Sequence, residues 1–175
     1  MSQASKQVDW CIKKAQEEIE ECKKQGKKPK HRGLLKVKPS IEEAKRHIGK
    51  AEHDINVTEY LIKGGFRDAS IGTIFYTMYQ CFLAITSKFG YESGNQTCTI
   101  ALIESLKEEG KIDLDEKFIR YFKYEDDEVK DSIIEMREDY TYGTDITPDK
   151  SKIEFFIKEC RELIDRTREI IYKEK

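Results

Sequence analysis

Apolar residues recur at intervals of three and four along most of the chain, which is the spacing of one face of an α-helix. The fifth of the helices predicted here, residues 115–140, is strongly acidic, and its pattern allows an interruption near residues 125–127. Thr97 is the expected cap of the fourth helix, and Thr147, followed by Pro148, is the expected cap of the last. The pattern predicts helices over residues 6–22, 40–64, 68–89, 97–109, 115–140 and 148–175.

The second helix carries the most regular pattern in the chain. Small residues follow each isoleucine of a heptad repeat by three positions, in the order Ile41, Ala44, Ile48, Ala51, Ile55, Thr58, Ile62. Such a seam lets a neighbouring helix approach closely, either within the bundle or in a homodimer. Ser40 and Glu43 fit a capping box at its start, and Gly64 and Gly65 stop it.

The third helix is predicted to lie at the centre of the fold, because no charged residue occurs between Ala69 and Ser87. Helices joined by short loops favour an all-α fold, an antiparallel bundle of four to five helices with an additional N-terminal helix. Residues 1–39 would form that N-terminal helix and a basic linker, and residues 40–175 the bundle. The linker, residues 23–39, lacks periodicity and contains two glycines and two prolines, with a possible turn over 33–37.

The composition of the 175 residues supports this interpretation, with 38% apolar and 38% charged residues. Ten glycines and three prolines are too few for the many turns of a β-sandwich, and 10% aromatic residues argue against disorder. No apolar run approaches the roughly 18 residues that a membrane-spanning helix needs. We therefore expect no contact with a membrane.

Charge is distributed unevenly along the chain. Residues 1–50 hold 14 Lys/Arg and 7 Asp/Glu and are therefore basic. Because the whole chain has a net charge of −2, residues 51–175 carry a net negative charge. The stretch from Lys23 to Lys38 contains eight basic residues and no acidic one. It is either a solvated linker or a non-specific contact to a phosphate backbone. The candidate RNA-binding residues within it are Lys27, Lys28, Lys30 and Arg32.

The five cysteines are odd in number and form no CxxC pair: Cys11, Cys22, Cys81, Cys98 and Cys160. Several fall on apolar helix faces, so we expect reduced thiols that serve as small core residues. The first 25 residues contain no apolar stretch of the kind found in a secretory signal. A cytoplasmic location is the resulting expectation.

Common catalytic and cofactor motifs are absent from the sequence. His47 and His53 are six positions apart on the second helix, about 120° around its axis, so they do not form a metal-binding pair. His31 lies in the linker, and neither a Walker loop, a GxGxxG loop nor a GxSxG elbow occurs. We therefore expect no metal and no cofactor.

Two segments resemble a known family. One is Gly65-Phe66-Arg67-Asp68-Ala69 with the aromatic stretch from Phe75 to Ile85, and the other is Arg137-Glu138-Asp139-Tyr140 before a long last helix. Together they are similar to the HEPN domain, over about residues 40–172. The resemblance implies a helical bundle and a homodimer that pairs the arginine-bearing segments. Many HEPN proteins are ribonucleases of toxin–antitoxin, CRISPR-associated or other defence systems; others bind nucleotides or RNA without cutting, or act beside a minimal nucleotidyltransferase.

Active members of that family carry a histidine four to six residues after the arginine. The imidazole acts on the ribose 2′-hydroxyl and the arginine holds the phosphate, without a metal. Here the corresponding positions are Tyr142, Gly143 and Thr144, and no histidine follows His53. Tyrosine, with a pKa of about 10, is a poor general base at neutral pH. The catalytic machinery is therefore incomplete at the motif.

The sequence thus favours a HEPN-like module that binds nucleotide, RNA or a protein partner and lacks nuclease activity. Arg137 would grip phosphate, with Tyr76, Tyr79, Tyr140 and Tyr142 beside it, although the same tyrosines also suit the core and Arg137 also suits a helix end. The alternative is a metal-independent ribonuclease toxin paired with a nucleotidyltransferase. Its catalytic set would be Arg137, Asp139 and Tyr142, or His53 brought close by folding.

Overall fold

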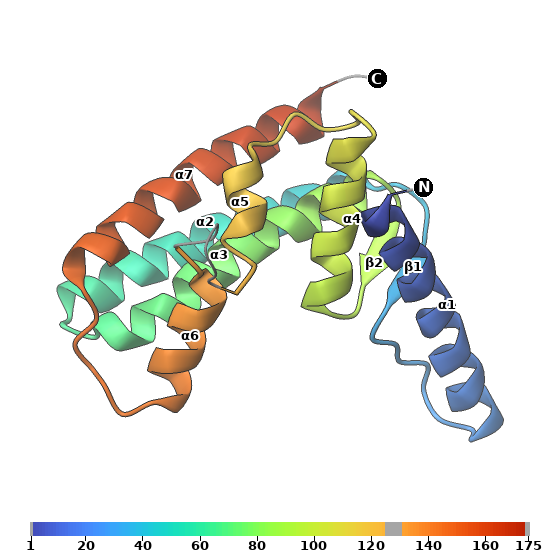
Figure 1. Ribbon diagram of the computed structural model, residues 1–175, viewed down its shortest axis with the longest axis horizontal. Coiled ribbons are helices and arrows are strands. Elements are labelled where there is room, and N and C mark those ends of the chain that lie inside the picture. The colour runs from blue at the N-terminus through green and yellow to red at the C-terminus, as the bar shows by residue number, and fades with distance from the viewer. Residues whose placement is uncertain (1, 125–130, 174–175) are drawn as a thin grey trace.

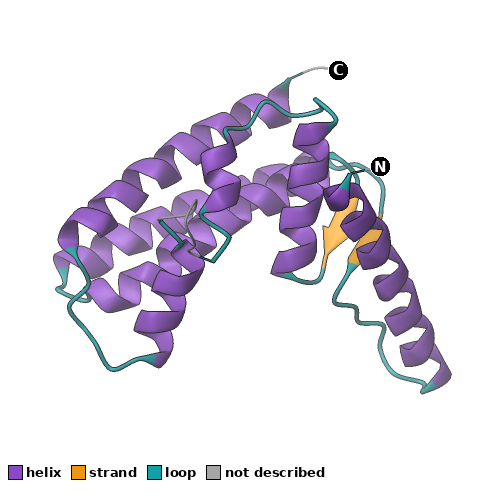
Figure 2. Ribbon diagram, viewed as in Figure 1, coloured by secondary structure: helices purple, strands orange, loops and turns teal. Residues whose placement is uncertain are grey.

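A computed structural model describes residues 2–124 and 131–173 of the chain (Figure 1). Helices dominate, and the two strands are three residues long each (Figure 2). The elements are α1 (Gln3–Lys24), β1 (Leu34–Lys36), α2 (Ile41–Lys63), α3 (Arg67–Lys88), β2 (Tyr91–Ser93), α4 (Gln96–Glu108), α5 (Glu116–Arg120), α6 (Ile133–Tyr142) and α7 (Lys150–Tyr172). The all-α fold predicted from the periodicity is confirmed.

The long helices α2, α3 and α7 pack against one another and form the bundle, and α4 and α6 pack on α3. The helix α1 lies at the opposite side of the molecule from α6, where it contacts α4 and β1 (Figure 1). Within the described part of the chain, every helix is too short or too polar to cross a membrane.

The central position predicted for α3 is confirmed, because this helix contacts α2, α4, α6 and α7. Its side chains Ile74, Phe82 and Ile85 are completely buried. Two buried threonines satisfy their hydroxyls within the helix, since Thr77 and Thr86 each donate to the carbonyl four residues earlier. The uncharged stretch of α3, residues 69–87, can therefore be enclosed by neighbours with these two hydroxyls paired.

The seam of α2 faces the inside of the bundle. Ala44, Ala51 and Thr58 are completely buried, and α2 packs on α3 and α7. The ends of the seam are less buried, since 40% of Ile41 is exposed. The heptad pattern therefore indicates close packing within the chain, because its small residues let α3 lie against α2.

The linker prediction is wrong for residues 34–36, which form β1. This strand pairs antiparallel with β2, so that Leu34 lies opposite Ser93. Leu34 is completely buried, and a Cβ on Gly33 would lie 2.1 Å from the Cys11 carbonyl oxygen. Only glycine permits this approach of the strand to α1. A three-residue strand has too short a pattern to stand out, and its partner lies nearly sixty residues later.

The expectation of five reduced cysteines is wrong for two of them. Cys11 of α1 and Cys98 of α4 form a disulfide with their Cα atoms 5.8 Å apart. The other three are free, and Cys81 and Cys160 are buried in the core as predicted. Burial raises the pKa of the Cys81 thiol to about 12. The pairing could not be predicted from the sequence, because the two cysteines are 87 positions apart and no motif links them.

Three predicted helix boundaries also need correction. The stretch 115–140 forms two helices, α5 and α6, and its expected interruption near 125–127 lies outside the described residues. The cap of α4 is Asn95 rather than Thr97, because the Asn95 side chain accepts from the Cys98 amide at 2.8 Å. The cap of α7 is Asp149 rather than Thr147, and Asp149 accepts from the Ser151 amide at 2.8 Å. In both cases an Asn or Asp two positions away from the threonine supplies the cap instead.

The Asp149 cap makes a prediction about pH. Hydrogen bonds from the hydroxyl and the amide of Ser151 lower the pKa of Asp149 in the folded protein. A carboxylate with a depressed folded pKa stabilises the fold above its unfolded pKa of about 3.9, and this contribution is lost as pH falls through the folded value. We therefore expect the variant Asp149→Asn, which still caps but does not titrate, to lose less stability than the wild type on acidification.

Urea unfolding near pH 5 and near pH 3 measures this difference, with the change in midpoint between the two conditions as the readout. Glu17→Gln serves as the control, because Glu17 is exposed and pairs only with Lys13 at 3.7 Å. Parallel pH responses of the Asp149→Asn variant and the wild type would show that the carboxylate is not linked to folding.

Candidate functional site

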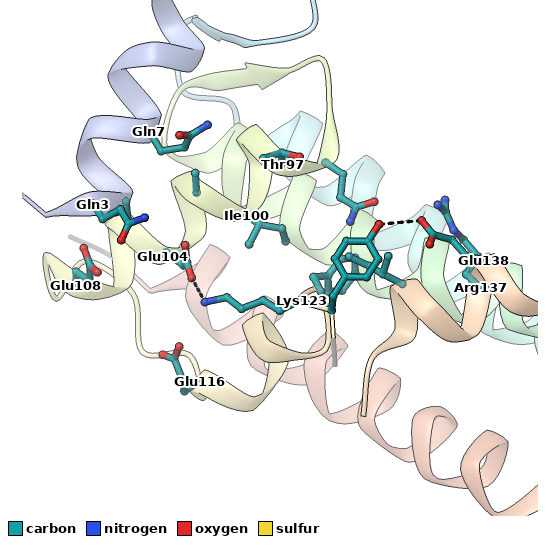
Figure 3. A pocket seen from close by; sticks show the side chains of 16 residues that line it. Gln3, Gln7, Thr97, Ile100, Glu104, Glu108, Glu116, Lys123, Arg137 and Glu138 are labelled. Atoms are coloured by element: carbon teal, nitrogen blue, oxygen red, sulfur yellow. Dashed lines mark hydrogen bonds and ion pairs between the residues drawn. The ribbon is translucent and has the colours of Figure 1, made fainter. Parts of the chain in front are cut away.

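A cavity of about 860 Å³ lies between the first turns of α1, the helices α4 and α5, and the helix α6 (Figure 3). Arg137 and Glu138 lie at one end and Gln3 and Glu108 at the other. The described residues that line it are Gln3, Ala4, Gln7, Gln96, Thr97, Ile100, Ala101, Glu104, Glu108, Glu116, Phe122, Lys123, Tyr124, Ile134, Arg137 and Glu138. It is thus a mostly polar hollow whose walls come from distant parts of the sequence.

Arg137 occupies an unusual position in this cavity. Its guanidinium carbon lies 4.3 Å from the centre of the Phe75 ring, within the range of a cation–π interaction. The Nε atom is buried and has no hydrogen-bond partner among the described residues. Neither do those residues supply a carboxylate within ion-pair distance of Arg137. Arg137 therefore lines the cavity with a guanidinium that has no anionic partner among the described residues.

Aromatic packing holds Phe75, and through it Arg137, in place. The Phe75 ring lies 5.4 Å from that of Phe122 and is stacked with that of Tyr79 at 6.0 Å. Phe122 in turn contacts Phe82 at 5.0 Å, in the middle of α3. The helix α6 is anchored by its buried isoleucines and a cap at Ser132. The platform under the guanidinium is therefore part of the core.

Four glutamates line the cavity, and three of them already have partners. Lys123 pairs with Glu104 at 2.6 Å, and Lys107 lies 3.9 Å from Glu116. Tyr124 donates its hydroxyl to Glu138 at 3.1 Å, which raises the pKa of Tyr124. A cavity with four glutamates repels a long polyanion. It suits a ligand with one anionic group at Arg137 and hydrogen-bond donors facing the glutamates.

None of the tyrosines expected beside Arg137 is among the described residues that line the cavity, and two of them contact the Phe75 ring instead. Tyr79 stacks on Phe75, and its hydroxyl bonds to Thr99 at 3.1 Å, while burial raises its pKa. Tyr76 is half exposed and meets Phe75 edge-on. Tyr140 packs against the core. Desolvation is also the main cause that raises the pKa of Tyr140.

The candidate catalytic residues are not gathered at Arg137. Asp139 and Tyr142 follow it by two and five positions, which turns them about 200° and 140° away around α6. Both are exposed, and 80% of Tyr142 is accessible to solvent. His53 is exposed on α2, and His47 bonds to Gln80 at 2.7 Å. None of the described residues that line the cavity is a histidine.

The basic candidates lie elsewhere. Lys27, Lys30 and Arg32 line a second hollow of about 480 Å³ beyond the last turn of α1, and Lys28 is exposed beside them. This end of α1 lies far from α6 (Figure 1). Among the described residues, none of these four side chains forms an ion pair. They form a separate basic surface, which we call the α1 basic end.

Sequence reasoning named Arg137, which lines this cavity, and named none of its other lining residues as site residues. Gln3 and Gln7 come from α1, and Tyr124 and Glu138 form their bond across fourteen positions. No motif connects these residues, so only the packing of α1 on α4 and of α6 on α3 could reveal them. Searches against protein-family models and curated protein sequences find no match to this chain. Among the described residues, no group of three His, Cys, Asp or Glu side chains could hold a metal ion.

Proposed function

We propose that this protein is a HEPN-like binding module that takes a nucleotide, free or at the end of an RNA, in the Arg137 cavity without cutting it. One observation carries the proposal: Arg137 has no anionic partner among the described residues, yet it is fixed over Phe75 and lines a cavity. A planar guanidinium presents paired donors that match a phosphate. The cavity volume is in the usual range for a small-molecule site.

The charges around the cavity favour one phosphate over several. Arg137 and Lys123 are the cations of the described lining, and Lys123 is already paired with Glu104. Free carboxylate oxygens and the amides of Gln3 and Gln7 can bond to the amino and ring groups of a base. A nucleoside monophosphate or an RNA terminus therefore fits better than a triphosphate, whose added charge the glutamates would repel.

A longer RNA would extend toward the α1 basic end. The helix α1 has 22 residues, so its two ends are about 30 Å apart at 1.5 Å per residue. Exposed lysines there can neutralise backbone phosphates without sequence preference. The HEPN resemblance also implies a homodimer and a nucleotidyltransferase-type partner, and we include both in the proposal. A cytoplasmic location is proposed as well, where the three free thiols would persist and the Cys11–Cys98 disulfide would form and break with the redox state of the compartment.

The proposal predicts that Arg137→Ala weakens nucleotide binding by about 10- to 100-fold, the loss expected for a charged hydrogen bond worth about 1.5–3 kcal/mol. Isothermal titration with AMP and fluorescence anisotropy with a short single-stranded RNA measure it. Arg46→Ala is the matched control, because Arg46 pairs only with exposed Glu43 on α2. Wild-type protein that binds neither probe, or binds both as well after Arg137→Ala, would contradict the proposal.

The same RNA incubated with EDTA separates binding from catalysis. We expect intact RNA, since no imidazole lines the cavity among the described residues. Metal-independent cleavage that disappears in Arg137→Ala would instead establish the ribonuclease alternative. Asp139→Ala and Tyr142→Phe would then identify the general base.

A further inference from the structure

The helix α1 is attached to the rest of the protein by few apolar contacts. It buries only Ala4, Val8, Cys11 and Ala15, whereas α3, also 22 residues long, buries eleven residues. Its neighbours are α4 and the short strand β1. Small side chains contribute little apolar area, so packing alone holds α1 weakly.

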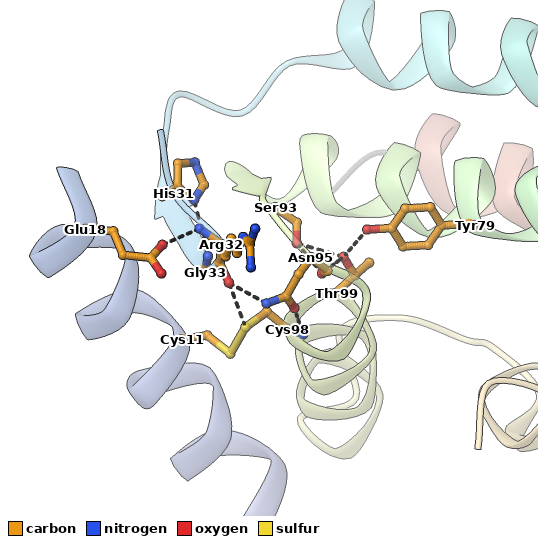
Figure 4. Close-up of a disulfide and its surroundings, with 10 residues drawn as sticks. All are labelled: Cys11, Glu18, His31, Arg32, Gly33, Tyr79, Ser93, Asn95, Cys98 and Thr99. Carbon is orange, nitrogen blue, oxygen red and sulfur yellow. Dashed lines mark hydrogen bonds between the residues drawn. A yellow bond between two sulfur atoms is a disulfide. The ribbon is translucent and has the colours of Figure 1, made fainter. Parts of the chain in front are cut away.

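The disulfide is the covalent part of this attachment (Figure 4). Cys11 lies in the middle of α1, and Cys98 lies in the first turn of α4. Around it, Asn95 donates its side-chain amide to the Arg32 carbonyl and accepts from the Cys98 amide. Cys11 and Cys98 are the only cross-linked pair among the described cysteines, and three free thiols accompany them.

The cross-link lies directly beside the candidate site. Gln3, Ala4 and Gln7 form the α1 wall of the Arg137 cavity, and Cys11 follows Gln7 by one helical turn. Any movement of the first half of α1 therefore changes this wall. The remaining walls belong to α4, α5, α6 and the segment after α5, which the disulfide reaches only through Cys98.

We propose that the Cys11–Cys98 disulfide is a redox latch that keeps the α1 wall of the Arg137 cavity closed. A dithiol reductant breaks the S–S bond by two exchange steps, which leave two cysteine thiols and the cyclic disulfide of the reductant. Both cysteines are completely buried, so exchange proceeds through transient openings of α1. After reduction α1 is held by the packing of Ala4, Val8, Ile12 and Ala15, by its contacts with α4 and β1 and by the hydrogen bond from the Arg32 amide to Glu18, and it opens more often.

Hydrogen exchange with mass spectrometry tests the latch without any ligand. Dithiothreitol reduction of the wild-type protein should accelerate amide exchange in residues 3–24 by at least about tenfold within minutes of labelling. Over the same minutes α3 and α7 should remain protected, because their amides exchange only through the rarer unfolding of the whole protein. Cys98→Ser should reproduce this pattern in the absence of reductant. Cys22→Ser is the control, because Cys22 is on α1 outside the cross-link and should leave exchange unchanged. Circular dichroism confirms that reduced protein remains folded.

A second readout rests on the proposed function. If the cavity takes AMP, reduction should weaken binding by about tenfold, since the amides of Gln3 and Gln7 leave the site. Unchanged exchange in α1 after complete reduction, or loss of protection in α3 and α7 within the same minutes as in α1, would overturn the latch. Absence of AMP binding in both redox states would reject the ligand alone, because the exchange measurement decides the latch independently.

Discussion

Phe82→Ala is expected to lower the free energy of unfolding by about 3–5 kcal/mol, the range for removing a buried phenylalanine. Phe82 is completely buried in the middle of α3 and packs on Phe122 with ring centres 5.0 Å apart. Because α3 contacts four other helices, the surroundings cannot collapse into the space without displacing one of them. The same ring supports Phe122, which lines the Arg137 cavity.

Urea unfolding followed by circular dichroism measures this loss. Phe82→Leu keeps most of the volume and should cost less than about 1.5 kcal/mol. Phe66→Ala is the exposed control, since 59% of Phe66 is accessible, and it should stay within about 0.5 kcal/mol of the wild type. Equal effects of Phe82→Ala and Phe66→Ala would mean that the centre of α3 is not the core described above.

Loss of the Cys11–Cys98 disulfide is expected to lower the free energy of unfolding by about 4–5 kcal/mol. The bond closes a loop between residues 87 positions apart, and opening a loop of that length returns this much conformational entropy to the unfolded chain. Cys11→Ala, Cys98→Ala and the double variant should therefore have similar stabilities, because either change removes the cross-link.

Chemical denaturation with and without dithiothreitol checks this prediction. Reductant should move the wild type to the stability of the variants and leave the variants unchanged. Cys22→Ala should respond to reductant as the wild type does, because it retains the cross-link. A wild-type midpoint that does not move after verified reduction would show that the disulfide contributes nothing to stability. A free energy of unfolding for Cys98→Ala equal to that of the wild type would show the same.

The arginine of the candidate site illustrates the limit of motif-based prediction. The resemblance singled out Arg137, which lies on the helix before the last one and lines the cavity. It also grouped Arg137 with Asp139 and Tyr142, which are near in sequence but turn to other faces of α6. Proximity on a helix depends on angle as well as spacing, and the cavity walls come from α1 and α4 instead.

Sequence alone determined the parts of this protein that depend on local patterns. The uncharged stretch of α3, the small residues of α2 and the glycine stop after it each act within one helix and its neighbour, so their periodicity is sufficient. Only the tertiary structure decided the disulfide, the β1–β2 pair and the cavity. Each joins segments tens of residues apart, and their meeting depends on how whole helices pack, which no local spacing encodes.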